Sequence, residues 1–415
     1  MSSPKYAGVY IENLAEKVYI FNRLIYMNHA STSPRKSERV KDALTGLFTQ
    51  DGILSAGRNF EGLEDGAVML RARKALMKLF GFSSATNVIL TGGVTISLNM
   101  ILGGLLKPGD HALATHVEHN AVSRPLALLQ KRGIIDVDFL PCGQDGSFDP
   151  RSIGKYIRPN TRLFIMTHAS NVLGTILPAE ECFTEAKRFG LFTVLDAAQT
   201  AGLLPLEMNK NIDVLAFTGH KGLGGLPGSG GFVLGRDAAA AIDPWITGGT
   251  GSASQSLEQP DFLPDKYESG TANIPGILSL AVAVEELLER GLSPIREQTK
   301  NLTRRFLDGI RGIPNLVVHG PGDAERSVAI VPVSSPGWDN ALLAGRLFDE
   351  YGIITRCGLH CSPLAHQSAG TFPEGSLRFS FGYETTEGEI DAAVRALENL
   401  VGRAAGRRGG IQAGN

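Results

Sequence analysis

Residues 213–221 read Asp-Val-Leu-Ala-Phe-Thr-Gly-His-Lys, an apolar run that ends on a lysine inside a glycine-rich loop. The run predicts a buried strand over residues 213–217, and the glycines after Lys221 allow the backbone to approach a ligand closely. Lys221 is therefore expected at the end of a strand, where its amine can reach a pocket at the edge of a sheet. A solvated lysine on a flexible surface loop is the alternative that this stretch leaves open.

Strand and helix patterns alternate on both sides of this stretch. Strands are predicted at residues 87–91, 111–115, 162–167, 192–195 and 231–234, and helices at 96–106, 122–132 and 180–188. This alternation predicts an α/β fold with a mostly parallel sheet that is covered on both faces. Ligands of such sheets bind at the carboxyl ends of the strands.

The pattern changes after about residue 270 and predicts a smaller α+β domain. Helices are expected at 274–290, 293–313, 340–351 and 386–400, and short strands at 316–318, 328–333 and 377–381. We therefore expect a large domain over residues 26–272 and a small C-terminal domain over 273–401. Residues 1–25 are expected to pack with the small domain. Residues 402–415 are expected to form a disordered tail because they are rich in glycine, alanine and arginine.

Composition narrows the classes of function. The 415-residue chain has a net charge of -2, which favours neither nucleic acid nor an anionic membrane as a partner. No apolar run reaches the roughly 18 residues of a membrane span, and we find no signal peptide. Four cysteines are too few for a disulfide scaffold in a chain of this length, so a reducing, cytoplasmic setting is expected.

A carboxylate and an amide follow the predicted strand at 192–195. Asp196 ends that strand, and a carboxylate there can keep a pyridine nitrogen protonated, which turns the ring into an electron sink. Gln199 lies three residues further on and can hydrogen-bond the phenolic oxygen of the same ring. An aspartate that simply caps a helix is the alternative.

Three more strand ends carry polar residues. Gly93, Val94 and Thr95 open a helix and can cradle a phosphate. His119 can stack on an aromatic cofactor, and Asn171 is placed for a ring substituent. A glycine turn with a threonine cap, a structural histidine and an asparagine turn are the respective alternatives. Taken together, these residues and Lys221 are the parts that a pyridoxal-phosphate site needs.

A set of short strings occurs in a recognisable order. They are Thr-Gly-Gly-Val-Thr-x-x-x-Asn (91–99), Glu-His-x-Ala (118–121), His-x-Ser-Asn-Val-x-Gly (168–174), Asp-Ala-Ala-Gln (196–199), Gly-His-Lys (219–221), Pro-Gly-Ser-Gly (227–230), Glu-Ser-Gly-Thr (268–271) and Arg-Cys-Gly-Leu-His-Cys (356–361). With these strings the sequence resembles the class V aminotransferase family, in its cysteine desulfurase and selenocysteine lyase branch. The resemblance runs from about residue 26 to about residue 400.

The resemblance implies a fold-type I enzyme with a seven-stranded sheet in its large domain, with pyridoxal 5'-phosphate as its cofactor. It implies that Lys221 holds the cofactor covalently, that Asp196 pairs with the ring nitrogen, that His119 stacks on the ring and assists proton transfer, and that Gln199 and Asn171 contact the ring oxygen. The phosphate is implied to be bound by Gly93, Val94, Thr95, Thr218 and His220. Thr271 is implied to reach the phosphate of the partner subunit, in a homodimer with composite sites. The residues implied to contact the substrate are Asn171, Arg356, Arg378 and His29. Arg378 is implied to bind the substrate carboxylate.

Cys361 determines the expected reaction. The resemblance implies that its thiolate takes sulfur from L-cysteine, leaves alanine, and passes the sulfur to an acceptor protein. Two alternatives are a buried, inert Cys361 and a zinc site of Cys357, Cys361, His360 and His366, although Gly358 and Pro363 are expected to break any helix there. Cys357 is expected to pack, or to pair with Cys361 under oxidation, and Cys142 and Cys182 to be structural. No metal is expected.

Three residues depart from the family pattern. His29 is bulkier than the usual residue near the substrate, Leu359 replaces a frequent histidine, and Arg58 lies where many members carry an active-site histidine.

Rival functions keep the cofactor but change the reaction, to a selenocysteine lyase, an aminotransferase or an epimerase. A non-catalytic dimeric scaffold is a further alternative. A nucleotide-binding oxidoreductase lacks support because no Gly-x-Gly-x-x-Gly follows an early strand.

Overall fold

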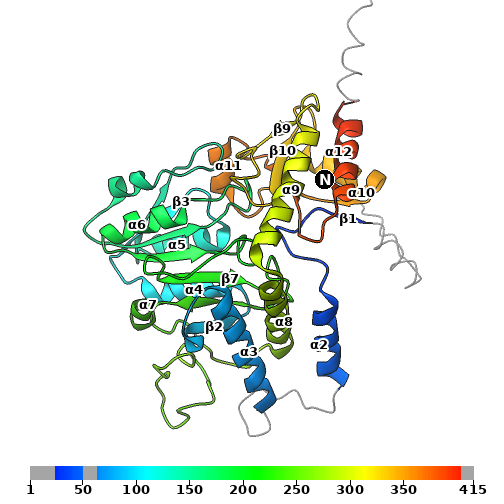
Figure 1. The fold of residues 1–415 in the computed structure, drawn as a ribbon. Helices are drawn as coiled ribbons and strands as arrows, with labels where there is room; N and C mark the ends of the chain where they lie inside the picture. Colours follow the sequence, from blue (N-terminus) through cyan, green and yellow to red (C-terminus); the bar gives the residue numbers. More distant parts are fainter. Residues whose placement is uncertain (1–23, 50–62, 403–415) are drawn as a thin grey trace, which may run out of the picture.

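The computed structural model describes residues 24–49 and 63–402, so Arg58 lies outside the described residues, as do residues 1–23 and 403–415. The centre of the molecule is a seven-stranded sheet (Figure 1). Its strand order is β2 (Val88–Thr91), β8 (Gly230–Leu234), β7 (Val214–Thr218), β6 (Phe192–Asp196), β5 (Thr161–Thr167), β3 (His111–Thr115) and β4 (Asp136–Leu140). β8 runs antiparallel to both neighbours, and the remaining pairs are parallel. The predicted mostly parallel sheet is confirmed.

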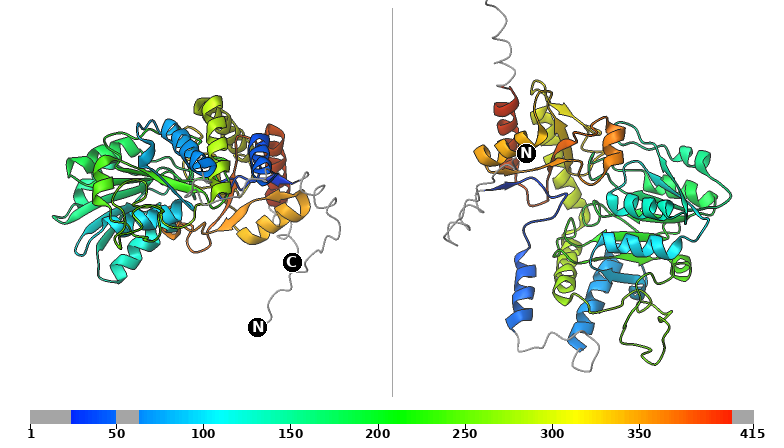
Figure 2. Two further views of the ribbon diagram at one scale, coloured as in Figure 1. Left: turned by 90° about the horizontal axis from the view of Figure 1, so that it is seen from below. Right: turned by 180° about the vertical axis from the view of Figure 1, so that it is seen from behind.

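Helices cover both faces of this sheet, which explains its apolar strands. Every residue of β3, β7 and β8 is buried, as expected where no strand face meets water. The core on one face includes residues of α3 (Leu63–Leu79), α6 (Ala179–Arg188) and α8 (Ile274–Arg290). The core on the other includes residues of α4 (Val94–Leu105), α5 (Asn120–Lys131) and α7 (Arg236–Ala241). Figure 2 shows the same arrangement from below and from behind.

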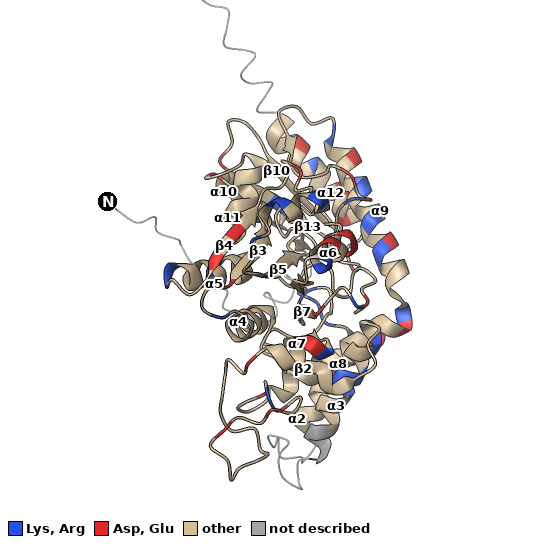
Figure 3. Ribbon diagram, turned by 90° about the vertical axis from the view of Figure 1, so that its left-hand side faces the viewer, with Lys and Arg blue, Asp and Glu red and all other residues tan. Residues whose placement is uncertain are grey.

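A second, smaller sheet lies beside the first. It has the antiparallel order β12 (Arg356–Gly358), β13 (Ser376–Ser380), β10 (Ile330–Ser334) and β9 (Val317–Val318). The chain enters this part at β1 (Ile25–Tyr26), which pairs in parallel with β11 (Ile353–Ile354). The helices α9 (Leu292–Ile310), α10 (Asn340–Tyr351) and α12 (Glu387–Leu397) complete its core. Lys and Arg are interspersed with Asp and Glu along α9 (Figure 3).

Several elements were not predicted from the sequence. β4 is interrupted by Asp136 and Asp138 and lies at the sheet edge, so it lacks the apolar run of a central strand. The expectation that Pro363 breaks any helix was wrong, because Pro363 begins the short helix α11 (Pro363–Ala369). Proline is tolerated at that first position, where the backbone amide has no partner within the helix. α2 (Glu38–Thr49), α3 and β12 were also missed.

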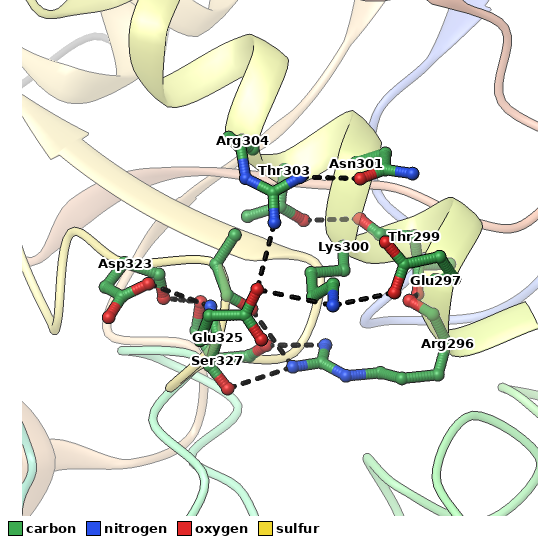
Figure 4. Close-up of polar contacts among 11 residues, drawn as sticks. Arg296, Glu297, Thr299, Lys300, Asn301, Thr303, Arg304, Asp323, Glu325 and Ser327 are labelled. Atoms are coloured by element: carbon green, nitrogen blue, oxygen red, sulfur yellow. Dashed lines mark hydrogen bonds and ion pairs between the residues drawn. The ribbon is translucent and has the colours of Figure 1, made fainter. Parts of the chain in front are cut away.

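A polar network ties α9 to the segment before β10 (Figure 4). Arg296 donates to the carbonyls of Ala324, Glu325 and Ser327 at 3.0, 3.1 and 2.8 Å. The Glu325 carboxylate in turn pairs with Lys300 and Arg304. Ser327 also forms a backbone bridge to Thr175, next to the large sheet. The segment therefore connects the two sheets.

In the part of the chain that the structure describes, no helix is long and apolar enough to cross a membrane. α8, which the predicted boundary assigns to the small domain, packs against α2 and α3. The boundary at residues 272 and 273 stays a prediction.

Candidate active site

A cavity of about 300 Å³ opens at the carboxyl ends of the parallel strands. Its wall is shared between the loops that follow β3, β5, β6 and β7 and the edge of the small sheet. The predicted site residues that line it are Gly93, Val94, Thr95, His119, Asn171, Asp196, Gln199, Thr218, His220, Lys221, Arg356 and Arg378. Residues from seven separate stretches of the sequence therefore meet at the place where an α/β sheet binds its ligands.

Lys221 follows β7 by three residues and reaches the cavity from the turn that this strand enters. Burial and the charges of Arg378 and Arg356 lower the pKa of its amine, whereas Asp196 raises it, and the net value is about 8. A lysine with this pKa has a sizeable neutral fraction near neutral pH. Its amine can therefore react with a carbonyl group without prior deprotonation by another residue.

Asp196 and Glu118 are two buried carboxyl groups beneath the cavity. Asp196 ends β6 and accepts a hydrogen bond of 2.9 Å from the Ala198 amide, and burial raises its pKa. Glu118 accepts from the Thr115 hydroxyl at 2.5 Å and the Thr167 amide at 2.9 Å, and burial raises its pKa to about 8. Sequence reasoning missed Glu118, although it directly precedes His119. Asp196 is the one of the two that lines the cavity, so it is the carboxyl group that can accept a hydrogen bond from a protonated group in the cavity.

The phosphate end of the predicted site lies where α4 begins. Gly93 is the N-cap of α4 and has a φ of 137°, a conformation that side chains rarely adopt. A Cβ on Gly93 would lie 3.5 Å from the Thr218 hydroxyl, so the helix start and the end of β7 meet here. Free amides of a helix N-terminus beside Thr and His side chains are a suitable donor set for a phosphate.

His119 and Gln199 already have hydrogen-bonding partners. The His119 ring accepts from the Ala121 amide at 3.0 Å and so caps α5, and burial lowers its pKa to about 4, which keeps it neutral. Gln199 donates to the Ala30 carbonyl at 3.1 Å. Both side chains are thereby held against the cavity wall.

Two arginines converge on one side of the cavity. Arg378 is 1% exposed and donates to the Asn171 carbonyl at 2.7 Å and the Ser31 hydroxyl at 2.9 Å. Arg356 donates to the same hydroxyl at 3.1 Å. Burial and the charge of Arg356 lower the pKa of Arg378 to about 9, and its Nε has no partner. The pair suits an anion such as a carboxylate. Ser31 was not anticipated from the sequence.

Cys361 does not line the cavity itself, but its neighbours Arg356 and His360 do, and it is close enough to Lys221 to act on the pKa of that amine. Its side chain is exposed, and its Sγ is 4.0 Å from the Arg356 Nη2. This exposure contradicts the alternative of a buried, inert cysteine. His360 and His366 pack together with ring centres 5.6 Å apart, each bonded to a neighbouring hydroxyl-bearing residue. Among the described residues no group of three or more His, Cys, Asp or Glu could hold a metal ion.

Two predicted residues line other cavities. His29 packs on Gly382 and lies on the wall of a small neighbouring cavity, which shares Lys221 with the first. Burial lowers the pKa of His29 to about 4. Thr271 is exposed and lines a third cavity, which shares Gly92 and Ile96 with the first.

The other three cysteines pack in hydrophobic cores. Cys182 is fully buried and Cys142 partly buried beside the large sheet, and Cys357 packs on the core of the small one. Burial raises the pKa of Cys142 to about 12. All four cysteines are free thiols.

Known proteins share this arrangement. The family model described as aminotransferase class-V matches residues 25–393. A cysteine desulfurase of Pectobacterium atrosepticum is 28% identical over 387 residues, which cover 91% of this chain and 93% of that protein. A probable cysteine desulfurase of Methanothermobacter thermautotrophicus is 28% identical over 403 residues, which cover 94% and 98%.

Solved structures agree with these sequence relatives. The apo cysteine desulfurase of Thermococcus onnurineus superposes with a TM-score of 0.85 at 26% identity, covering 94% of this chain and 99% of that one. A cysteine desulfurase of Escherichia coli gives a TM-score of 0.81 at 25% identity, covering 94% and 98%. Because the family model spans most of the sequence and the predicted fold is present, the chain belongs to the class V aminotransferase family.

Proposed function

We propose that this protein is a pyridoxal-phosphate-dependent cysteine desulfurase, which converts L-cysteine to L-alanine and takes the sulfur onto Cys361. The observation that carries the proposal is the exposed thiol of Cys361 beside Arg356, which lines the same cavity as Lys221. The sequence relatives that are cysteine desulfurases support the same reaction.

The residues present fit the cofactor. Free amides at the start of α4, with Thr95, Thr218 and His220, suit its phosphate, and buried Asp196 suits a protonated ring nitrogen. Lys221 offers the amine for its aldehyde, and His119 offers a neutral ring for stacking. When bound, pyridoxal phosphate supplies an electron-withdrawing ring that stabilises negative charge at the substrate Cα.

The remaining residues fit the amino acid. Arg378 and Arg356 hold the substrate carboxylate, and the unpartnered Arg378 Nε supplies a free donor. The Lys221 amine accepts the Cα proton, because its lowered pKa leaves it partly neutral. Asn171 orients the substrate beside the ring. His29 lines the neighbouring cavity, so its effect on the bound amino acid is indirect.

The sulfur step balances without an external oxidant. The Cys361 thiolate attacks the substrate sulfur, and an Sγ–S bond forms while the Cβ–S bond breaks. The electron pair stays on the carbon fragment, which takes up protons and leaves as alanine. One cysteine and one thiol thus give one alanine and one persulfide, whose outer sulfur passes to a second thiol on an acceptor protein.

Finer features of the proposal concern assembly and location. Exposed Thr271, which lines the third cavity, supports a homodimer in which it completes the partner's phosphate site. We also propose a cytoplasmic location, because four free thiols suit a reducing compartment. The two-domain division at 272 and 273 is part of the same proposal.

The decisive experiment compares wild type with Cys361→Ser, loaded with cofactor and supplied with L-cysteine. We expect wild type to form alanine and to show one added sulfur on the Cys361 peptide by mass spectrometry. Cys361→Ser should bind the cofactor with the same absorbance but form almost no alanine. Undiminished alanine formation by this variant would rule out the persulfide step and favour an aminotransferase, an epimerase or a selenocysteine lyase.

A further inference from the structure

The side chain of Asn171 spans the residue that carries the reactive thiol. Its Nδ2 donates to the His360 carbonyl at 2.7 Å, and its Oδ1 accepts from the Ser362 hydroxyl at 2.7 Å. One amide thus binds the residue before Cys361 and the residue after it. Asn171, His360 and Ser362 are 6%, 4% and 0% exposed, whereas Cys361 between them faces solvent.

Ser362 uses its hydroxyl in an unusual way. It is the N-cap residue of α11, a position where serine normally accepts a hydrogen bond from the first turn of the helix. Here it makes no such bond and turns its hydroxyl to Asn171 instead. The hydroxyl therefore contributes to the cysteine turn and not to the helix.

The turn needs to be held in place. His360 and Cys361 have φ values of 49° and 61°, in the left-handed region that costs a side-chain-bearing residue roughly 1–2 kcal/mol. Such a conformation persists only where its surroundings fix it. The Asn120 amide supplies a further anchor, because it donates to the Cys361 carbonyl at 2.7 Å.

Asn171 is itself held by a residue of the substrate site. Arg378 donates to the Asn171 backbone carbonyl at 2.7 Å, and both residues line the main cavity. The same asparagine therefore lies between the arginine for the carboxylate and the turn that displays the thiol.

We propose that Ser362 is a positioning residue for sulfur transfer, which acts through Asn171 to fix the direction of the Cys361 thiol. The proposal rests on the desulfurase function argued above. It implies that the thiol is presented on a rigid turn, so that sulfur transfer requires the bound amino acid to lie within reach of a fixed atom.

The test uses Ser362→Ala in the cofactor-loaded protein. Ser368→Ala is the matched control, because Ser368 lies on the same helix and its hydroxyl faces His116 at 3.3 Å. We expect Ser362→Ala to lower kcat for alanine formation about ten- to a hundredfold, since misplacement by about 1 Å has such effects. The KM for cysteine should stay within about twofold, and the cofactor absorbance should not change.

A second readout does not depend on turnover. The rate at which a bulky maleimide alkylates Cys361 should rise several-fold in Ser362→Ala and stay at the wild-type value in Ser368→Ala. Wild-type kcat together with a wild-type alkylation rate in Ser362→Ala would overturn the proposal.

Hydrogen exchange of the unmutated protein covers the case in which Ser362→Ala does not fold. The amide of Ser362, which donates to the Leu359 carbonyl at 2.9 Å, should exchange slowly. Exchange across residues 359–363 at the rate of an unstructured peptide would contradict a rigid turn. If wild type forms no alanine, the desulfurase proposal fails, while alkylation and exchange still decide whether the turn is held.

Discussion

At the scale of single residues, the protonation state of Lys221 determines what the pocket can do. Four ionisable neighbours and burial act on one amine: burial, Arg378 and Arg356 favour its neutral form, and Asp196 and Cys361 favour its charged form. The net result is a pKa of about 8 instead of the 10.5 of an ordinary lysine. A carbonyl group reacts with the neutral amine, so the pocket prepares Lys221 for covalent attachment near neutral pH.

This balance predicts a pH dependence. Because the pKa is lowered, the neutral fraction of Lys221 rises about tenfold per pH unit up to about pH 8 and then levels off. The rate at which cofactor-free protein attaches added pyridoxal phosphate should follow the same curve. The measurement is the growth of the cofactor absorbance in stopped-flow experiments between about pH 6 and 10.

Arg356→Gln supplies the comparison for this curve. Removing a cation that lowers the pKa of Lys221 should move the rise to higher pH, whereas Arg346→Gln, on the outer surface of α10, should not move it. A wild-type curve that keeps rising to pH 10 would show that burial does not set the pKa of Lys221.

At the scale of elements, the site depends on the close approach of β8 to the start of α4. A Cβ on Gly230 would lie 2.6 Å from the Cα of Gly93 and 2.8 Å from the carbonyl oxygen of Phe217. Both contacts are with backbone, which cannot rotate away. A glycine is thus required in β8 so that the amides of α4 can stand beside Thr218.

Gly230→Ala should therefore affect both stability and cofactor binding. We expect a loss of about 1–3 kcal/mol in the free energy of unfolding, because the added methyl group overpacks the contact. Affinity for pyridoxal phosphate should also fall, because the start of α4 has to move. Urea unfolding of the cofactor-free protein and an equilibrium titration with the cofactor measure the two effects.

Gly345→Ala is the control for this prediction. Its Cβ would meet nothing within 4 Å inside α10, so the change should leave cofactor affinity unaltered and stabilise the helix by up to about 1 kcal/mol. Unchanged affinity and stability in Gly230→Ala would mean that β8 and α4 can separate freely.

At the scale of the whole molecule, the two sheets are connected by the segment that Arg296 anchors. The guanidinium of Arg296 satisfies three backbone carbonyls at once, and burial lowers its pKa. The Ile176 amide donates a hydrogen bond of 2.9 Å to the carbonyl of Arg326, which lies in the anchored segment. Ile176 follows Asn171 by five residues. Anchoring of α9 is thus linked to the loop that carries part of the site.

Arg296→Ala should lower the free energy of unfolding by about 1–3 kcal/mol, because it removes the donor from the carbonyls of Ala324, Glu325 and Ser327. Arg311→Ala is the control, since Arg311 is 73% exposed and makes only a surface pair with Asp308. That change should stay within about 0.5 kcal/mol. Equal effects in urea unfolding would contradict a specific anchor.

Much of the fold could be predicted from the sequence. The apolar runs of β3, β7 and β8 match their predicted positions to within one residue, and α8 and α10 match at both ends. Burial on both faces leaves a continuous apolar signal, which sequence alone can carry. β4 and β12 gave no such signal, because charged or glycine residues interrupt them and their pairing partners supply the stability.

The types of residue in the site could also be predicted from the sequence, because strand ends in an α/β sheet converge. The residues that hydrogen-bond to them could not be predicted. Glu118 beneath the cavity, Ser31 between two arginines and Ser362 behind the thiol are each held by contacts with chain segments tens to hundreds of residues away. The sequence by itself determined which chemical groups the protein possesses. Only the tertiary structure decided which of them are buried, charged and fixed, because burial and hydrogen bonding depend on neighbours that are distant along the chain.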